Sequence, residues 1–177
     1  MKYCAFIRGV NVKGTNMKMA EVCDVFKKAG VENVTSVLAS GNIIFSSERK
    51  AEELKVLLEK SMSEHFSYDA FLFIKSQEEI ENFWNGNPFL KEDHLHCYAF
   101  IGNNGIENIL MKEFENGSKT EYEEAKIANH IFYWQISKGN TLDSSFGKIL
   151  GRKTMKDQFT SRNINTFEKI LKVLNKN

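Results

Sequence analysis

The chain has 177 residues, of which 42% are hydrophobic, and its 24 lysines and arginines nearly balance its 23 aspartates and glutamates. This length allows one large domain or two small ones, and 14 phenylalanines are enough for a substantial core. A formal net charge of +1 argues against a dedicated nucleic-acid binder with a strong basic field, although a local basic patch is compatible with it.

Targeting and redox signals point to the cytoplasm. The first residues lack the long apolar run of a signal peptide because Arg8 interrupts them early. No window reaches the ~18 apolar residues of a membrane span, so no membrane partner is expected. Cys4, Cys23 and Cys97 are few, odd in number and far apart, which favours reduced thiols without a disulfide.

The first half of the chain has the pattern β-α-β-β-α-β. Apolar residues alternate where strands are expected and recur every three or four residues where helices are expected. The expected elements are a strand at 3–7, a helix from Met19 to Ala29 ended by Gly30, strands at 34–38 and 43–45, a helix from Leu54 to Met62 and a strand at 70–74. Between the two middle strands, Gly41-Asn42 is expected to supply the positive φ of a two-residue hairpin turn.

A capping box separates the two halves. Ser76-Gln77-Glu78-Glu79 predicts the start of a helix that continues through Trp84, and Asn85-Gly86-Asn87-Pro88 ends it. We therefore expect an N-terminal subdomain at 1–76, a linking helix and turn at 77–92, and a C-terminal subdomain at 93–177.

The second half repeats much of this order. Its expected elements are a strand at 95–101, a helix from Ile106 to Phe114, a hairpin of strands 123–127 and 131–136 about Ala128-Asn129, a short helix at 146–150 and a last helix carrying Ile164, Phe167, Leu171 and Leu174. This copy ends in a helix where the first ends in a strand. The sequence thus predicts an α+β fold of two tandem ferredoxin-like (α/β plait) subdomains with antiparallel sheets.

The loop after the first strand is the first candidate site. Gly9 and Gly14 are spaced as in a phosphate-binding P-loop, but Thr15 and Asn16 stand where that motif requires Lys and Ser/Thr, which excludes nucleotide hydrolysis of that type. Glycines still let the backbone approach a ligand, and amides at the start of the following helix favour an anion. A long solvated loop with Arg8 paired to a carboxylate is the alternative. The candidate ligand-binding residues of this loop are Arg8, Gly9, Asn11, Lys13, Gly14 and Asn16.

Two further segments complete the candidate site. Ser40-Gly41-Asn42 forms a turn that can also present a hydroxyl and an amide to a ligand. The segment 160–166 is expected to begin the last helix, with Thr160 or Asn165 as N-cap. Arg162 in the first turn would oppose the helix dipole, which an acidic partner or a bound anion would offset, and Asn163 follows it. The neighbouring basic residues are either a solvated face or part of a binding surface; they are Lys148, Arg152, Lys153 and Lys156.

Taken together, these motifs resemble the bacterial family called domain of unknown function 1697. The resemblance is carried by Arg8-Gly9-Val10-Asn11-Val12-Lys13-Gly14 with Met19, by Ser40-Gly41-Asn42-Ile43-Ile44-Phe45, and by Thr160-Ser161-Arg162-Asn163 with Asn165-Thr166. The chain departs from the family at Ile164, where a tryptophan is common, and at Lys18, where a proline is frequent. The resemblance implies two ferredoxin-like subdomains in tandem and supplies no established activity.

Other residues give weaker signals. His94 and His96 would share a strand face, but no third ligand is spaced to complete a metal site, so neither a metal nor a cofactor is expected. Several strand aromatics are candidates for core packing or for stacking on single-stranded RNA, and we favour the core; they are Phe71, Phe73, Phe132, Tyr133 and Trp134.

The sequence favours a protein that binds a small anionic ligand, such as a nucleotide or a phosphorylated metabolite. Its pocket is expected to join the Arg8–Asn16 loop, Ser40–Asn42 and Arg162–Asn163. One alternative is a single-stranded RNA- or DNA-binding protein that uses an open sheet face and the basic segment Lys148–Arg162. Another is a non-catalytic interaction module, most simply a homodimer. Whether a reaction is catalysed stays open.

Overall fold

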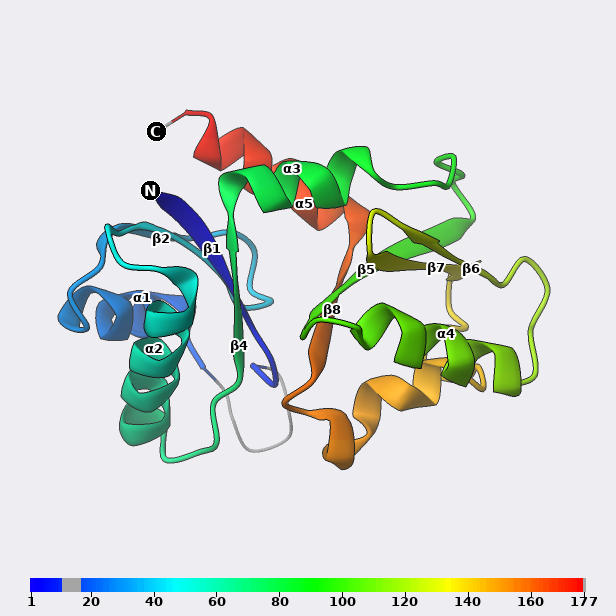
Figure 1. Ribbon diagram of the computed structural model, residues 1–177, viewed down its shortest axis with the longest axis horizontal. Coiled ribbons are helices and arrows are strands. Elements are labelled where there is room, and N and C mark those ends of the chain that lie inside the picture. The colour runs from blue at the N-terminus through cyan, green and yellow to red at the C-terminus, as the bar shows by residue number, and fades with distance from the viewer. Residues whose placement is uncertain (11–16, 177) are drawn as a thin grey trace. The chain divides into compact units, whose positions relative to one another are not determined.

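The computed structural model describes residues 1–10 and 17–176, which form two four-stranded antiparallel sheets with helices packed against them (Figure 1). The chain divides into two compact units, and this α+β class agrees with the prediction. Unit 1 comprises residues 1–81 and 168–177, and unit 2 comprises residues 82–167. The division falls within helix α3 (Gln77–Asn85) and helix α5 (Ile164–Leu174). The subdomain boundaries given above stay a prediction. Among the described residues, no helix is long and apolar enough to cross a membrane.

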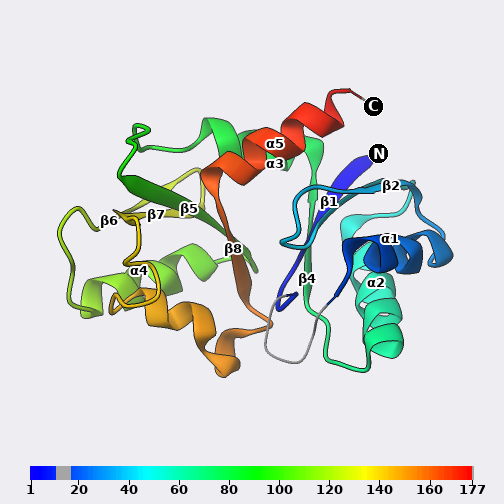
Figure 2. The ribbon, with the colours of Figure 1, turned by 180° about the vertical axis from the view of Figure 1, so that it is seen from behind.

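Unit 1 is built around the sheet β2-β3-β1-β4, in which every pair of neighbours is antiparallel. Its elements are β1 (Lys2–Ile7), α1 (Met19–Lys28), β2 (Glu32–Ser36), β3 (Asn42–Ser46), α2 (Ala51–Phe66) and β4 (Leu72–Ser76). Helices α1 and α2 lie on the same face of this sheet (Figure 1, and from behind in Figure 2). The core between them contains Phe26, Phe45, Leu54 and Leu58, all of which are fully buried.

Unit 2 is built around the sheet β6-β7-β5-β8, which has the same strand order as unit 1. Its elements are β5 (Leu95–Gly102), α4 (Ile106–Asn116), β6 (Glu124–Ala128), β7 (Ile131–Ser137), the 3₁₀ helices η1 (Gly147–Gly151) and η2 (Lys153–Met155), and β8 (Phe159–Asn163). Two short 3₁₀ helices thus stand in this unit where α2 stands in the other.

The two faces of the unit 2 sheet have different neighbours. Tyr98 lies opposite Trp134, and this face packs in the core that contains Leu110 of α4. Side chains alternate along a strand, so Cys97 and its partner Gln135 point to the other face. There the Tyr133 hydroxyl donates to the carbonyl oxygen of Phe83 at 3.0 Å. Cys97 and Gln135 on this second face line the candidate site described below.

The predicted start of the last helix is wrong. Residues 159–163 form strand β8, in which Phe159 pairs with Gly102 and Asn163 pairs with Tyr98, and the helix begins only at Ile164. The side-chain oxygen of Asn163 accepts a hydrogen bond from the Asn165 amide at 3.0 Å, so Asn163 caps the helix in place of Thr160 or Asn165. Arg162 is therefore a strand residue and does not oppose the helix dipole. Pairing with β5, which is distant in sequence, overrides the local pattern.

Both hairpin turns differ from the expected ones. Asn42 is the first residue of β3, and the positive φ angles before it belong to Leu38 (62°) and Gly41 (76°), so a longer loop replaces the two-residue turn. In unit 2 the turn consists of Asn129 (φ 51°) and His130 (φ 60°), one residue later than predicted. Positive φ at both central residues is what a two-residue hairpin turn with the strand twist requires.

The capping box of α3 is confirmed. The Ser76 amide donates to Glu79 Oε2 at 2.8 Å, and the Glu79 amide donates to Ser76 Oγ at 3.2 Å. The two residues thus satisfy each other's amide groups at the start of the helix.

Candidate functional site

The first predicted segment is described only in part. Arg8 and Gly9 follow β1 and are half-buried, and the Arg8 amide donates to the carbonyl oxygen of Phe71 at 3.0 Å. Gly9 has a φ of 81°, which explains a glycine at this position. The other candidates of this loop lie outside the described residues; they are Asn11, Lys13, Gly14 and Asn16.

The Ser40–Asn42 turn lies beside the start of this loop within unit 1. The Ile7 amide donates to the carbonyl oxygen of Gly41 at 2.8 Å. A Cβ atom on Gly41 would come within 2.4 Å of Val10 Cγ2, so only glycine allows this close approach. Asn42 is fully buried, and its amide donates to the carbonyl oxygen of Val37 at 2.9 Å and to Ser40 Oγ at 3.0 Å. These contacts of Asn42 hold the turn together.

The third predicted segment belongs to unit 2. Arg162 is only 9% exposed, and its Nη1 donates to Thr160 Oγ1 and to the carbonyl oxygen of Ser161, both at 2.8 Å. Arg8 lies in unit 1, so the predicted convergence of the two arginines on one pocket stays a prediction.

The basic segment next to it runs from η1 through η2 to Lys156. Its four basic side chains are exposed, and Arg152 Nη1 lies 2.7 Å from Glu113 Oε2. The charge of Arg152 is thus used in a surface ion pair.

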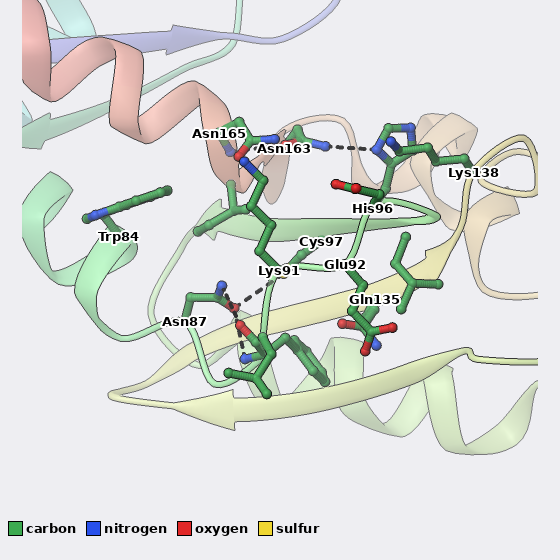
Figure 3. Close-up of a pocket in the computed structure, with 15 residues that line it drawn as sticks. Trp84, Asn87, Lys91, Glu92, His96, Cys97, Gln135, Lys138, Asn163 and Asn165 are labelled. Carbon is green, nitrogen blue, oxygen red and sulfur yellow. Dashed lines mark hydrogen bonds between the residues drawn. The ribbon is translucent and has the colours of Figure 1, made fainter.

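Unit 2 contains a cavity of about 370 Å³ that the sequence did not reveal (Figure 3). It is bounded by the segment that follows α3, by strands β5 and β7, and by the junction of β8 with α5. Its apolar wall consists of Trp84, Phe89, Leu90, Leu95 and Ile164. This volume lies within the range of ~300–1,000 Å³ that is typical of small-molecule sites.

Two asparagines fix the shape of the cavity. Asn87 Oδ1 accepts hydrogen bonds from the Phe89 amide at 3.2 Å and from the Cys97 thiol at 3.3 Å. Asn163 caps α5 with its oxygen and lies 3.2 Å from His96 Nδ1 through its Nδ2. Both side chains are thus committed to the surrounding structure, and among the described residues Asn163 is the one predicted site residue that lines the cavity.

Gln135 differs from these asparagines. Its side chain is buried, at 9% exposure, and lines the cavity beside Cys97, its partner across the strands. Within the described part of the chain, no group forms a hydrogen bond with its side-chain amide. The amide atoms are not fully enclosed, because the Tyr68 hydroxyl is the one fully buried side-chain polar group without a partner among the described residues. The Gln135 amide is therefore accessible from the cavity, where a ligand can form the hydrogen bonds that no described residue supplies. Gln135 is therefore the residue of this cavity that is best placed to meet a ligand.

The charges at the cavity come from its rim. Lys91 and Lys138 line it and form no ion pair with any described residue, whereas Glu92 Oε2 lies 3.7 Å from His94 Nε2. The carboxylates of Glu92 and Asp93 balance the two lysines, so the rim can hold an anion at one place and a neutral or cationic group at another.

The pKa values of two titratable groups of the cavity are shifted toward the neutral form. Burial, and then the charge of Lys138, lowers the pKa of His96, and burial raises the pKa of the Cys97 thiol to about 12. A thiol with such a pKa is a poor nucleophile at neutral pH. Among the described residues, no three His, Cys, Asp or Glu side chains are grouped to hold a metal ion.

The sequence held one signal for this cavity. Gln135 follows Ile131-Phe132-Tyr133-Trp134 and precedes Ile136, so a polar residue interrupts an otherwise apolar buried strand. A polar side chain in such a run is a candidate for a partner that is not part of the strand.

Comparisons with known proteins establish the family and the fold. The family described as "Protein of unknown function (DUF1697)" matches residues 1–133. The solved structure of the conserved bacterial protein SP0830 from Streptococcus pneumoniae is similar, with 22% sequence identity, coverage of 98% of each chain and a TM-score of 0.77. A comparison with curated proteins gives no match. At this identity, the structural similarity speaks for the fold alone.

Proposed function

We propose that this chain, which belongs to the family of proteins of unknown function DUF1697, binds a small anionic molecule in the cavity of unit 2. The observation that carries the proposal is the unpaired amide of Gln135 on the wall of a 370 Å³ cavity. Small-molecule sites commonly combine apolar walls with a few convergent polar groups, and this cavity has that composition.

The anionic character of the ligand is inferred from the two rim lysines, which have no ion pair among the described residues, whereas Glu92 Oε2 lies 3.7 Å from His94 Nε2. Lys91 and Lys138 are exposed at the rim without an ion pair among the described residues. An ammonium group binds phosphate as a point charge without a fixed geometry, which suits lysines on a rim. That residues of the Arg8–Asn16 loop add to anion binding stays a prediction.

The proposal is tested by thermal unfolding in the presence of inorganic phosphate, ribose 5-phosphate and nucleoside monophosphates. A ligand at a hundred times its Kd adds ~2.7 kcal/mol of stability. We expect the Lys91→Ala/Lys138→Ala double variant to lose most of this stabilisation. Lys112→Ala is the matched control, because Lys112 is an exposed lysine of α4, which packs on the opposite sheet face.

Salt gives a second criterion. If the lysines bind the anion, the stabilisation should weaken as the salt concentration rises, because exposed charges are screened. No stabilisation by any of these compounds, or equal stabilisation of the wild type and the double variant, would refute the proposed site.

We also assign both units to the ferredoxin-like α/β plait. Support comes from the β-α-β-β-α-β order of unit 1 and from the strand order β2-β3-β1-β4, which β6-β7-β5-β8 repeats. Cys4, Cys23 and Cys97 form no disulfide among the described residues, which supports a cytoplasmic location as part of the same proposal.

The two alternatives have less support. Single-stranded RNA or DNA binding was expected to use strand aromatics, but Phe132, Tyr133 and Trp134 are at most 1% exposed. Stacking on bases requires accessible rings, so these three residues serve the core. The homo-oligomeric interaction module stays a prediction.

A further inference from the structure

We infer that Gln135 recognises the hydrogen-bonding edge of a nucleobase, and that the ligand of the cavity is a nucleoside monophosphate. This inference rests on the proposed function and narrows it from small anions in general to one chemical class.

The first argument is the chemistry of the unpaired group. A glutamine amide offers a carbonyl acceptor and an NH₂ donor side by side. Its best partner therefore presents a donor next to an acceptor in one plane, and nucleobases do so along their edges. Because Gln135 is buried, a ligand that left it unpaired would leave its desolvation uncompensated.

The second argument is the aromatic wall. Trp84 lines the cavity with a partly exposed indole ring, whose N–H has no hydrogen-bond partner among the described residues. Figure 3 shows Trp84 on the α3 side of the cavity and Gln135 on the strand side. A flat base can thus lie between a stacking surface and a hydrogen-bonding group.

The third argument is size and charge. The volume of about 370 Å³ is near the lower end of the range for ligand sites, which favours a mononucleotide over a dinucleotide. Lys91 and Lys138 are available to the phosphate. A phosphorylated sugar without a base would use these lysines and leave Gln135 and Trp84 without a role.

The inference is tested by isothermal titration calorimetry on the full chain. The ligands are the four ribonucleoside monophosphates, with ribose 5-phosphate as the same phosphate without a base. We expect at least one nucleotide to bind the wild type roughly tenfold more tightly than ribose 5-phosphate does, which is the discrimination typical of one paired amide edge.

Gln135→Leu separates base recognition from binding of the phosphate. In this variant the preference for the nucleotide over ribose 5-phosphate should fall by roughly tenfold. Gln158→Leu is the matched control, because Gln158 is a partly exposed glutamine of unit 2 whose Nε2 donates to the carbonyl oxygen of Thr154 at 3.3 Å. It should behave as the wild type.

The outcomes distinguish the two proposals. If ribose 5-phosphate binds the wild type as tightly as every nucleotide, base recognition is wrong and the proposed anion site stands. If a nucleotide preference survives in Gln135→Leu, the role of Gln135 is wrong. If none of these ligands binds, the proposed function fails and this inference fails with it. The comparison of nucleotides with ribose 5-phosphate uses the wild type alone. It can therefore still refute the inference if the Gln135→Leu protein does not fold.

Discussion

Asn42 in unit 1 and Gln135 in unit 2 are both buried amides on sheet strands, yet their surroundings differ. Asn42 is fully buried, and its NH₂ group donates to the carbonyl oxygen of Val37 and to Ser40 Oγ. Gln135 is 9% exposed and faces a cavity, and its side-chain amide has no hydrogen-bond partner among the described residues. The first amide serves the fold, whereas the second is available to a ligand.

The difference teaches that a conspicuous polar motif need not be the site. Ser40-Gly41-Asn42 attracts attention because three small or polar residues follow one another, but a tight loop needs the same residues. Gln135 stands alone in the apolar run of β7, and its side chain forms no hydrogen bond with a described residue. The first two predictions below test whether the two amides have these separate roles, and the next ones extend the comparison to other polar side chains.

The largest expected effect is that of Asn42→Ala. Removing this side chain deletes two hydrogen bonds and leaves the buried Val37 carbonyl group with fewer partners. We expect a loss of about 3 kcal/mol in the free energy of unfolding, measured by chemical denaturation. Asn108→Ala, at an exposed position of α4, is the control and should change stability by less than ~0.5 kcal/mol. A similar loss of unfolding free energy in Asn42→Ala and Asn108→Ala would show that Asn42 has no special role in the fold.

Gln135→Leu should act in the opposite direction. Leucine has a similar volume and removes an unpaired polar group, so the ligand-free protein should gain about 1 kcal/mol. Denaturation without ligand measures this gain. A loss of 1 kcal/mol or more would mean that the Gln135 amide is already satisfied in the folded chain, and the contrast with Asn42 would disappear.

Ser76→Ala extends the comparison to a second motif that is visible in the sequence. Its hydroxyl accepts the Glu79 amide at the start of α3, so its loss should cost about 1 kcal/mol. Gln135→Leu and Ser76→Ala should therefore change stability by similar amounts with opposite signs. No loss in Ser76→Ala would show that the capping box contributes little.

The smallest effect concerns pH. Burial, and then the charge of Lys138, lowers the pKa of His96 below its ordinary value of 6.5, so the folded state disfavours the protonated ring. Stability is then fully present above about pH 6.5 and falls as the pH drops from there through the lower pKa of the folded state. Protonation also prevents Nδ1 from accepting a hydrogen bond from Asn163.

His96→Gln removes this titration. Its free energy of unfolding should depend less on pH between pH 7 and pH 5 than that of the wild type. Identical pH profiles for the two proteins would show that His96 does not titrate differently in the folded state.

Local signals in the sequence predicted the elements of the fold well. The capping box at Ser76 and the apolar period of the helix from Met19 depend on neighbouring residues only, and both are found in the structure. Strand β8 was missed because its polar residues form a strand only through pairing with β5, about sixty residues earlier in the chain. The local spacing of apolar residues does not show which distant strand a segment pairs with.

The candidate site was predicted less well for the same reason. The motifs pointed to turn residues and arginines, and of those that the structure describes, only Asn163 lines the cavity. The cavity joins the segment after α3 to β7 and to the start of α5, and no sequence motif spans these three places. In the sequence, Gln135 was recognisable only as a polar residue in an apolar run. Such a pattern singles out the residue but does not show which other residues lie near it in the folded chain.

The most direct test follows the side-chain NH₂ resonances of Gln135 and Asn42 by NMR while nucleoside monophosphates are added. If the cavity binds through Gln135, the Gln135 resonances shift with the ligand concentration, and those of Asn42 stay in place as an internal reference. If the Gln135 resonances stay unchanged, a ligand site at Gln135 is contradicted. This holds both when other resonances shift, because the ligand then binds elsewhere, and when no resonance shifts, because the ligand then does not bind.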